Sequence, residues 1–256
     1  MNRTSPTTTA LGKDLLIGTR PLIEAIEAGK QIDKVLIQKG LKSVTFKELF
    51  PLLKEHNIQQ QNVPIEKLNR ITKKNHQGVI AFLSPVDFVP IEEVVARTYE
   101  SGIDPLLLIL DRVTDVRNFG AISRTAECTG AQGIVVPTRG SAPINYDALK
   151  TSAGALNHIA VSKEENLKDT IAFLKNSGLT IVACSEKGSE TAYETDLTGP
   201  IAIIMGSEEN GVSPEYLKLC DKVVKLPMSG KIGSLNVSVA AGALLFEIVR
   251  QNHYSN

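Results

Sequence analysis

The chain has 256 residues, enough for one large domain or two small ones, and its 42% hydrophobic and 22% charged residues are typical of a folded protein. The longest apolar runs are far too short to cross a bilayer, so no membrane span is expected, and the first residues lack the apolar stretch of a secretory signal. Cys128, Cys184 and Cys220 are odd in number and far apart, which favours a reducing compartment over a disulfide framework. We therefore expect a cytoplasmic protein.

The 28 basic and 28 acidic residues balance, but their distribution along the chain is uneven. Residues 1–90 hold 13 Lys and Arg against 8 Asp and Glu, about +5, whereas residues 91–256 hold 15 against 20, about −5. A basic N-terminal third suggests an anionic partner there, although a chance asymmetry of this size is an equally good explanation.

The N-terminal part is expected to be a disordered lead-in over residues 1–12, followed by a small α/β sandwich over residues 13–88. Its first helix has Leu22, Ile23 and Ile26 at helical spacing and ends near Gly29. The helix that follows the first strand is expected to be interrupted, or to begin, near Pro51. Helix and strand then alternate, with strands at 32–40, 58–64 and 76–85 and helices at 45–57 and 65–75.

Residues 89–104 are expected to form a linker that carries one short helix over 91–100. A second α/β unit, residues 105–256, begins with the apolar run 105–110, which is typical of a buried parallel strand. Strands alternating with helices predict a mostly parallel sheet with helices on both faces. Further strands are expected within 133–137, 146–162, 179–185, 200–206 and 222–228, and helices within 121–128, 146–162, 166–178, 213–220 and 234–251.

Ligands of such sheets bind at the carboxyl ends of the strands. Here those ends are "LDRVTDVRNFG", "ACSEKGS", "MGSEENGVS" and "LPMSGKIGSLN", of which the last three are rich in Gly, Ser, Asn and Glu. The sequence contains no G-x-G-x-x-G, no P-loop and no G-x-S-x-G, and its four histidines show no zinc-binding spacing, so no metal is expected. Any chemistry must use Arg, Asn, Ser, Glu and backbone groups.

Three segments stand out: "NFGAISR" with Asn118 and Arg124, "GSEENGVS" at 206–213, and "LPMSGKIGSLNVSVAAG" at 226–242. Together, in this order, they resemble the motifs of the SpoU, or TrmH-like, family of RNA ribose 2′-O-methyltransferases, within the knotted SPOUT superfamily. The N-terminal unit is similar to the family's substrate-binding domain, whose fold is like that of ribosomal protein L30e. An extension of this kind is found in bacterial enzymes that methylate a guanosine of 23S ribosomal RNA.

The resemblance implies a fold that the residue patterns do not propose, a trefoil knot formed by about Ile201 to Gly233. It also implies a methyl donor, S-adenosylmethionine, bound in the knot. The cofactor contacts that match the family's pattern are Gly206, Leu226, Met228, Ser234, Leu235 and Asn236. The family forms homodimers through its catalytic domain, near the active site, and the small and apolar residues of the last helix suit such a contact, although they suit core packing equally well.

The catalytic residues that the resemblance implies are Asn118, Arg124, Glu208, Ser234 and Asn236. Arg124 has the central role, either as a general base or, as we prefer, as a bidentate clamp on the phosphate beside the reacting ribose, because a guanidinium is normally always charged. Asn118 would hold the helix start and orient Arg124 or the ribose, with plain N-capping as the alternative. Glu208 would orient Asn118 or Arg124, or would accept a hydrogen bond from a loop amide, whereas its neighbour Glu209 is interpreted as a solvated charge. For Ser234, the alternative to a catalytic role is capping of the last helix.

RNA contacts are expected on the N-terminal unit, where lysine and arginine side chains could meet phosphates or simply form a solvated face. These residues are Lys39, Lys42, Lys67, Arg70, Lys73 and Lys74. Three functions remain open: methylation of ribosomal RNA at a guanosine, the same chemistry on transfer RNA, and a non-catalytic RNA-binding protein on the same scaffold. The complete set of motif residues argues against the third function.

Overall fold

The computed structural model describes residues 15–254, and within them the chain forms two compact units. The first comprises residues 15–86 with 144–146, and the second residues 87–143 and 147–254. The lead-in expected over residues 1–12 lies outside the described residues. Each unit has its own sheet and is described by itself.

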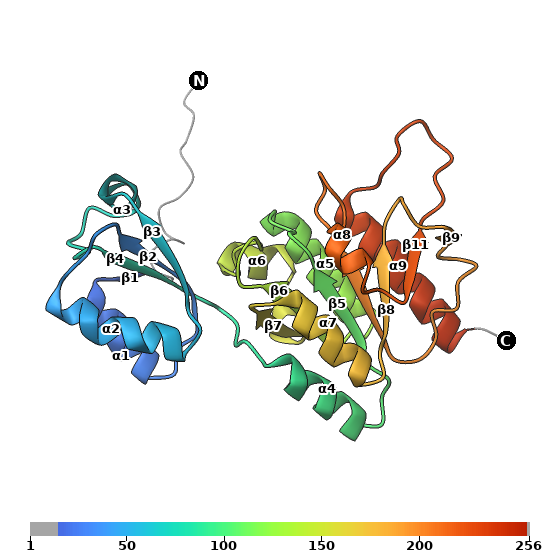
Figure 1. Ribbon diagram of the computed structural model, residues 1–256, viewed down its shortest axis with the longest axis horizontal. Coiled ribbons are helices and arrows are strands. Elements are labelled where there is room, and N and C mark those ends of the chain that lie inside the picture. Colours follow the sequence, from blue (N-terminus) through green and yellow to red (C-terminus); the bar gives the residue numbers. More distant parts are fainter. Residues whose placement is uncertain (1–14, 255–256) are drawn as a thin grey trace. The chain divides into compact units, whose positions relative to one another are not determined.

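The first unit is a four-stranded sheet in the order β1-β4-β2-β3. Strands β1 and β2 pair antiparallel with β4, while β2 and β3 run parallel. Helices α1 and α2 lie side by side on one face and α3 lies on the other (Figure 1). The elements are β1 (Leu15–Ile17), α1 (Thr19–Glu27), β2 (Ile32–Gln38), α2 (Val44–Glu55), β3 (Gln59–Val63), α3 (Ile65–Ile71) and β4 (Val79–Leu83).

Two details of this unit differ from the sequence prediction. Strand β1 was missed, because its three apolar residues merge with the helical pattern that follows them. Helix α2 neither stops nor begins at Pro51 but runs through it. Leu49 and Leu53, on either side of the proline, are both fully buried, so packing holds the two halves in one helix despite the missing N–H group.

The second unit has a seven-stranded sheet, and all of its strand pairs are parallel. The order is β7-β6-β5-β10-β8-β11-β9. Its strands are β5 (Leu106–Leu110), β6 (Gly133–Pro137), β7 (Ala160–Glu164), β8 (Thr180–Cys184), β9 (Glu190–Thr191), β10 (Ile201–Met205) and β11 (Lys222–Lys225). The predicted class, a mostly parallel α/β sheet with a small N-terminal sandwich, is confirmed, although the two-residue β9 was not predicted.

Helices cover both faces of this sheet. On one face α4 (Ile91–Glu100) and α7 (Leu167–Asn176) lie side by side (Figure 1) and share a core with β5, β8 and β10. Alternate strand residues point to the opposite face, where α5 (Val116–Cys128) packs against α9 (Val237–His253). The short helices α6 (Tyr146–Thr151) and α8 (Pro214–Leu217) complete the unit.

Residues 89–104, expected to be a linker, belong structurally to the second unit. The expected helix is present as α4 with the predicted bounds, but its Ile91, Val94 and Val95 are buried in the core of this sheet. The boundary between the compact units falls at Val86 and Asp87. Within residues 15–254 no helix combines the length and the apolar character that crossing a bilayer requires. The trefoil knot stays a prediction.

Candidate active site

The site lies where the two central strands of the larger sheet end. Strands β5 and β10 are paired in register, with Leu110 opposite Met205, and the N–H of Asp111 donates to the carbonyl of Met205 at 2.8 Å. Strands β6 and β7, which follow β5 in the chain, lie on one side of the β5–β10 pair. The next strand, β8, lies on the opposite side of this pair. Such a reversal of strand order is where open α/β sheets bind their ligands.

Helix α5 follows β5 and begins with a well-formed cap. Oδ1 of Asp115 accepts the N–H groups of Arg117 and Asn118, at 2.7 and 3.0 Å. The capping alternative for Asn118 is therefore wrong, because Asp115 holds that position and Asn118 lies inside the first turn. The side chain of Asn118 is free to point elsewhere.

Asn118, Glu208 and Asn236 form a closed cluster of hydrogen bonds. Oε1 of Glu208 accepts from Nδ2 of Asn118 at 2.6 Å and from Nδ2 of Asn236 at 2.8 Å. Asn236 also donates to Oδ1 of Asn118 at 3.0 Å and accepts the N–H of Ser238, so it is the N-cap of α9. Three segments far apart in sequence thus meet at the Glu208 carboxylate. Of the roles expected for Glu208, the contact with Asn118 is present.

The loop 206–213 that carries Glu208 is tight. The N–H of Ser207 donates to Gly211, and the N–H of Gly211 donates back to Ser207, at 3.1 and 2.9 Å. A Cβ atom at Gly206 would lie 2.0 Å from the carbonyl carbon of Gly211, so only glycine fits there. Glu209 is exposed, and no interaction ties it to the cluster among the hydrogen bonds described for this loop.

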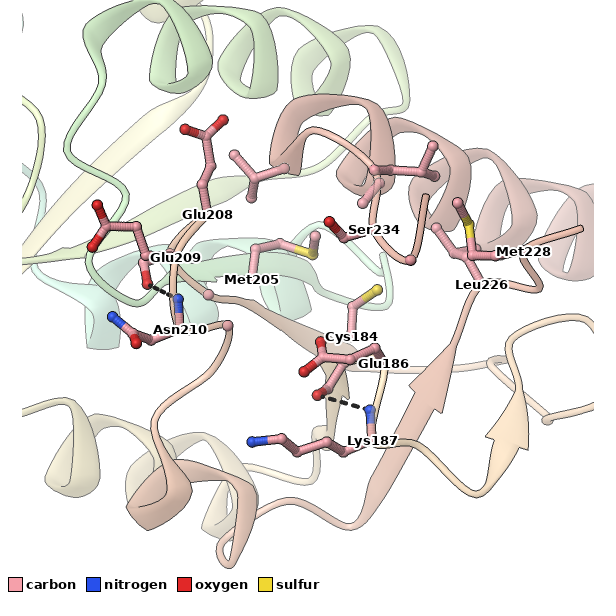
Figure 2. Close-up of a pocket in the computed structure, with 18 residues that line it drawn as sticks. Cys184, Glu186, Lys187, Met205, Glu208, Glu209, Asn210, Leu226, Met228 and Ser234 are labelled. Carbon is pink, nitrogen blue, oxygen red and sulfur yellow. Dashed lines mark hydrogen bonds between the residues drawn. The ribbon is translucent and has the colours of Figure 1, made fainter. Parts of the chain in front are cut away.

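A cavity of about 550 Å³ opens beside this loop (Figure 2). Five of the six expected cofactor residues line it, whereas Asn236 does not and instead contacts Asn118 and Glu208. Met205 and Val237 add to its apolar wall. The five are Gly206, Leu226, Met228, Ser234 and Leu235.

The carboxyl end of β8 supplies lining residues that the sequence analysis did not assign. Cys184, Ser185, Glu186 and Lys187 border the cavity (Figure 2). The signal for them was their place after a parallel strand, without a motif to single them out. Burial, with the nearby charge of Glu186, raises the pKa of the Cys184 thiol to about 11, so this thiol stays protonated and is a poor nucleophile near neutral pH.

A second, smaller cavity of about 300 Å³ lies on the other side of the Glu208 loop. Arg112, Thr114, Asp115 and Asn118 contribute to its wall. Both cavities share Val237 and residues 207–210, so Glu208 lies at the boundary between them, while Asn118 lines only the smaller cavity.

Arg124 does not join this cluster. It is exposed, lines neither cavity, and lies six residues after Asn118, which places the two side chains about 120° apart around the helix axis. Its neighbour Thr125 faces α9, since a Cβ at Gly242 would lie 3.6 Å from the Thr125 methyl. Arg124 therefore lies beside the contact between α5 and α9.

The six basic residues expected to contact RNA follow strands β2 and β3 in the chain, near the end of the sheet where these two parallel strands finish. The backbone joins the ends of β2 and β3 there, with the N–H of Lys39 donating to Val63 at 2.9 Å and that of Gln38 to Gly78 at 2.8 Å. All six residues expected to contact RNA are exposed and lie on these loops or on α3: Lys39, Lys42, Lys67, Arg70, Lys73 and Lys74. Across residues 15–254, no three His, Cys, Asp or Glu side chains come together as a metal site.

Comparison with known proteins identifies the family to which both units are similar. Residues 105–246 match the SpoU rRNA Methylase family, and residues 15–89 match a domain described as RNA 2′-O ribose methyltransferase substrate binding. A protein of Staphylococcus saprophyticus, named for the TrmH family of tRNA/rRNA methyltransferases, is 35% identical over 94% of this chain and 96% of its own. A similarly named Bacillus subtilis protein is 33% identical over the same shares.

Two solved structures are also similar. The SpoU methyltransferase AviRb of Streptomyces viridochromogenes, crystallised with S-adenosylmethionine, has 26% identity and a TM-score of 0.58, covering 93% of this chain and 89% of its own. A TrmH/SpoU tRNA modifying enzyme of A. aeolicus has 33% identity and a TM-score of 0.53 over 63% of this chain and 83% of its own. The match to more than half of the chain, and the relatives that align over nearly all of it, show that the protein belongs to the SpoU family of RNA methyltransferases.

Proposed function

We propose that this protein methylates the 2′-hydroxyl of a ribose in RNA, with S-adenosylmethionine as the donor. The observation that carries the proposal is the Asn118–Glu208–Asn236 cluster, whose Glu208 lines both a larger cavity and a smaller one. The larger would hold the donor and the smaller the acceptor nucleotide. A methyl group transferred between them passes this cluster.

The larger cavity has the features that S-adenosylmethionine requires. Met205, Leu226 and Leu235 provide an apolar wall for a purine ring, and the close backbone approach at Gly206 brings peptide groups within reach of its polar edge. S-adenosylmethionine, when bound, supplies a methyl group on a positively charged sulfur that is already a good leaving group. The larger chemical demand is then on the ribose hydroxyl, which is protonated near neutral pH.

The protein's own residues would align that hydroxyl for the transfer. Asn118 and Asn236 hold the Glu208 carboxylate through two hydrogen bonds to a single oxygen, which fixes its position at the boundary between the cavities. Such alignment of two reactants contributes about 7 kcal/mol or more in favourable cases. Ser234, in the larger cavity, would contact the donor.

For Arg124 we propose the bidentate phosphate clamp rather than the general base. Its exposed guanidinium has five N–H donors in a fixed fork, which suits a phosphate beside the reacting ribose. Because Arg124 lies away from the cluster of its own chain, it would act at a neighbouring chain's site.

We propose that this neighbour is a second copy of the protein, packed on α9. Val239 and Phe246 of α9 are 55% and 58% exposed and lie on one face with the small Gly242 and Ala243. Such a face is typical of a helix that packs closely on a partner. Arg124 lies on α5, next to this face.

As the acceptor we propose a guanosine of 23S ribosomal RNA, bound through the basic residues of the first unit. The six exposed lysine and arginine side chains there would supply phosphate contacts, and the whole unit matches a substrate-binding domain. The names of the relatives include both transfer and ribosomal RNA, so methylation of transfer RNA is the second candidate.

Cys128, Cys184 and Cys220 carry free thiols, which suits the reducing cytoplasm in which we place this activity.

The experiment that tests this function uses S-adenosylmethionine labelled on its methyl group. The protein is incubated with ribosomal or transfer RNA purified from cells that lack the gene. We expect label in ribosomal RNA, its loss with Asn118→Ala, and its retention with Arg117→Ala, a matched change one residue away on the exposed side of α5. Label in transfer RNA alone would favour the second candidate, and label in neither would leave a non-catalytic RNA-binding protein.

A further inference from the structure

Arg112, directly after β5, has a backbone conformation that arginine rarely adopts. Its φ is 58°, in the left-handed region where a side chain is strained and glycine is the usual residue. Strained backbone of this kind persists only where surrounding contacts hold it, and it concentrates at functional sites. The contacts of the Arg112 side chain indicate why this backbone conformation is retained.

The Arg112 guanidinium connects two partners. Its Nε and Nη2 donate to Oδ1 and Oδ2 of Asp111, at 2.9 and 3.1 Å, and Nη2 also donates to the carbonyl of Gly211 at 3.1 Å. The side chain of Asp111 is only 3% exposed, so its charge is nearly shielded from water. The hydrogen bond that Arg112 donates to Asp111 raises the pKa of Arg112, which therefore stays charged.

Asp111 in turn holds the far end of the Glu208 loop. Its Oδ2 accepts both the backbone N–H and the hydroxyl of Ser213, each at 2.7 Å. Gly211 and Ser213 both lie in the loop 206–213, three and five residues after Glu208. Asp111 and Arg112 thus fasten the C-terminal half of this loop to the end of β5.

We propose that Arg112 is a positioning residue that, together with Asp111, fixes the Glu208 carboxylate between the two cavities. This inference rests on the function proposed above and adds a residue outside the three segments that carried the family resemblance. The guanidinium does not touch Glu208; it acts through the carbonyl of Gly211, which also accepts the N–H of Ser207, next to Glu208. The Arg112 side chain makes its contacts with both Asp111 and Gly211 from this left-handed backbone conformation.

The variant Arg112→Gly separates the guanidinium from the backbone conformation, because glycine adopts this φ without strain. We expect the turnover number to fall at least tenfold, and by a larger factor than the KM for RNA rises, since Arg112 fixes a reacting geometry in addition to lining the smaller cavity. Arg112→Lys keeps a charge beside Asp111 but loses the fork, and we expect an intermediate turnover number.

A double-mutant cycle with Glu208→Gln gives the sharpest test. If Arg112 acts through Glu208, adding Arg112→Gly to Glu208→Gln lowers turnover by less than threefold, whereas independent effects would multiply. Thermal melts of each protein set an assay temperature at which all are folded. If Arg112→Gly does not fold, the same cycle is run with Arg112→Lys.

The outcomes are distinguishable. Turnover of Arg112→Gly and Arg112→Lys within threefold of the parent, or losses that multiply in the cycle, would overturn the positioning role while leaving the proposed function intact. A parent protein that transfers no methyl group to RNA would refute the function and this inference together.

Discussion

The Gly206→Ala substitution probes the tightest point of the larger cavity. The added methyl group would lie 2.0 Å from the carbonyl carbon of Gly211, 2.1 Å from the nitrogen of Val212 and 2.3 Å from the Gly211 oxygen. All three are backbone atoms, so no side chain can turn aside to make room. Because carbon atoms rest about 3.5 Å apart, the loop must move by roughly 1.5 Å.

The free-energy cost of that movement can be compared with the cost measured when a packed protein core is overfilled. Forcing an extra methyl group into a packed site costs about 1–3 kcal/mol. The displaced loop borders the cavity, so part of this cost falls on ligand binding. We expect the dissociation constant for S-adenosylmethionine to rise about 10- to 100-fold, which corresponds to about 1.4–2.8 kcal/mol.

Isothermal titration calorimetry with S-adenosylmethionine measures this effect without any RNA. The matched control is Gly233→Ala, which changes a glycine lining the same cavity where an added methyl group meets no atom within 4 Å. We expect the control to bind within threefold of the parent. Parent-like binding by Gly206→Ala, or equal weakening by both variants, would refute the assignment of this cavity to the donor.

Three further predictions address Arg124, α9 and the acid stability of the fold. Arg124→Lys keeps the charge but loses the fork, so methylation should fall at least tenfold with an unchanged melting temperature; turnover near that of the parent would contradict the bidentate clamp. Phe246→Glu places a charge on the exposed face of α9, so size-exclusion chromatography with light scattering should show a monomer, and an unchanged dimer would place the interface elsewhere. The hydrogen bond from Arg250 holds the pKa of Glu247 below its ordinary value, so this carboxylate stabilises the fold above about pH 4.3 and loses its effect as the pH falls through that lowered pKa. Glu247→Gln should therefore cost about 1–2 kcal/mol at pH 7 in urea unfolding and less at pH 3, and an equal cost at both pH values would contradict the ion pair.

Most of the larger sheet could be predicted from sequence because its strands are buried on both faces. A run such as Leu106–Leu110, in which every residue is buried, can hardly be anything but an interior strand or helix, and its length favours the strand. Short elements escaped prediction, since the three residues of β1 carry too little pattern to separate from the helix that follows. The role of α4 was missed because prolines on both sides give it the appearance of a linker, although its apolar face fits the sheet.

The sequence predicted which residues form the site better than it predicted which of them contact one another. Parallel strands place their carboxyl ends at one edge, which brings Asn118 and Glu208 together although 90 residues separate them. The sequence could not show that Asp115 would take the helix cap, because this depends on where α5 begins. Arg112 was undetectable in the sequence, because its role depends on a backbone angle that no residue pattern reports.

The position of the transferred methyl group tests the central proposal most directly. RNA labelled by the protein is hydrolysed in alkali, which requires a free 2′-hydroxyl at each cleaved position. Our account predicts that the label remains in alkali-resistant dinucleotides and that digestion to nucleosides assigns it to a guanosine methylated on its ribose. Label released in single nucleotides methylated on the base would contradict 2′-O-methylation.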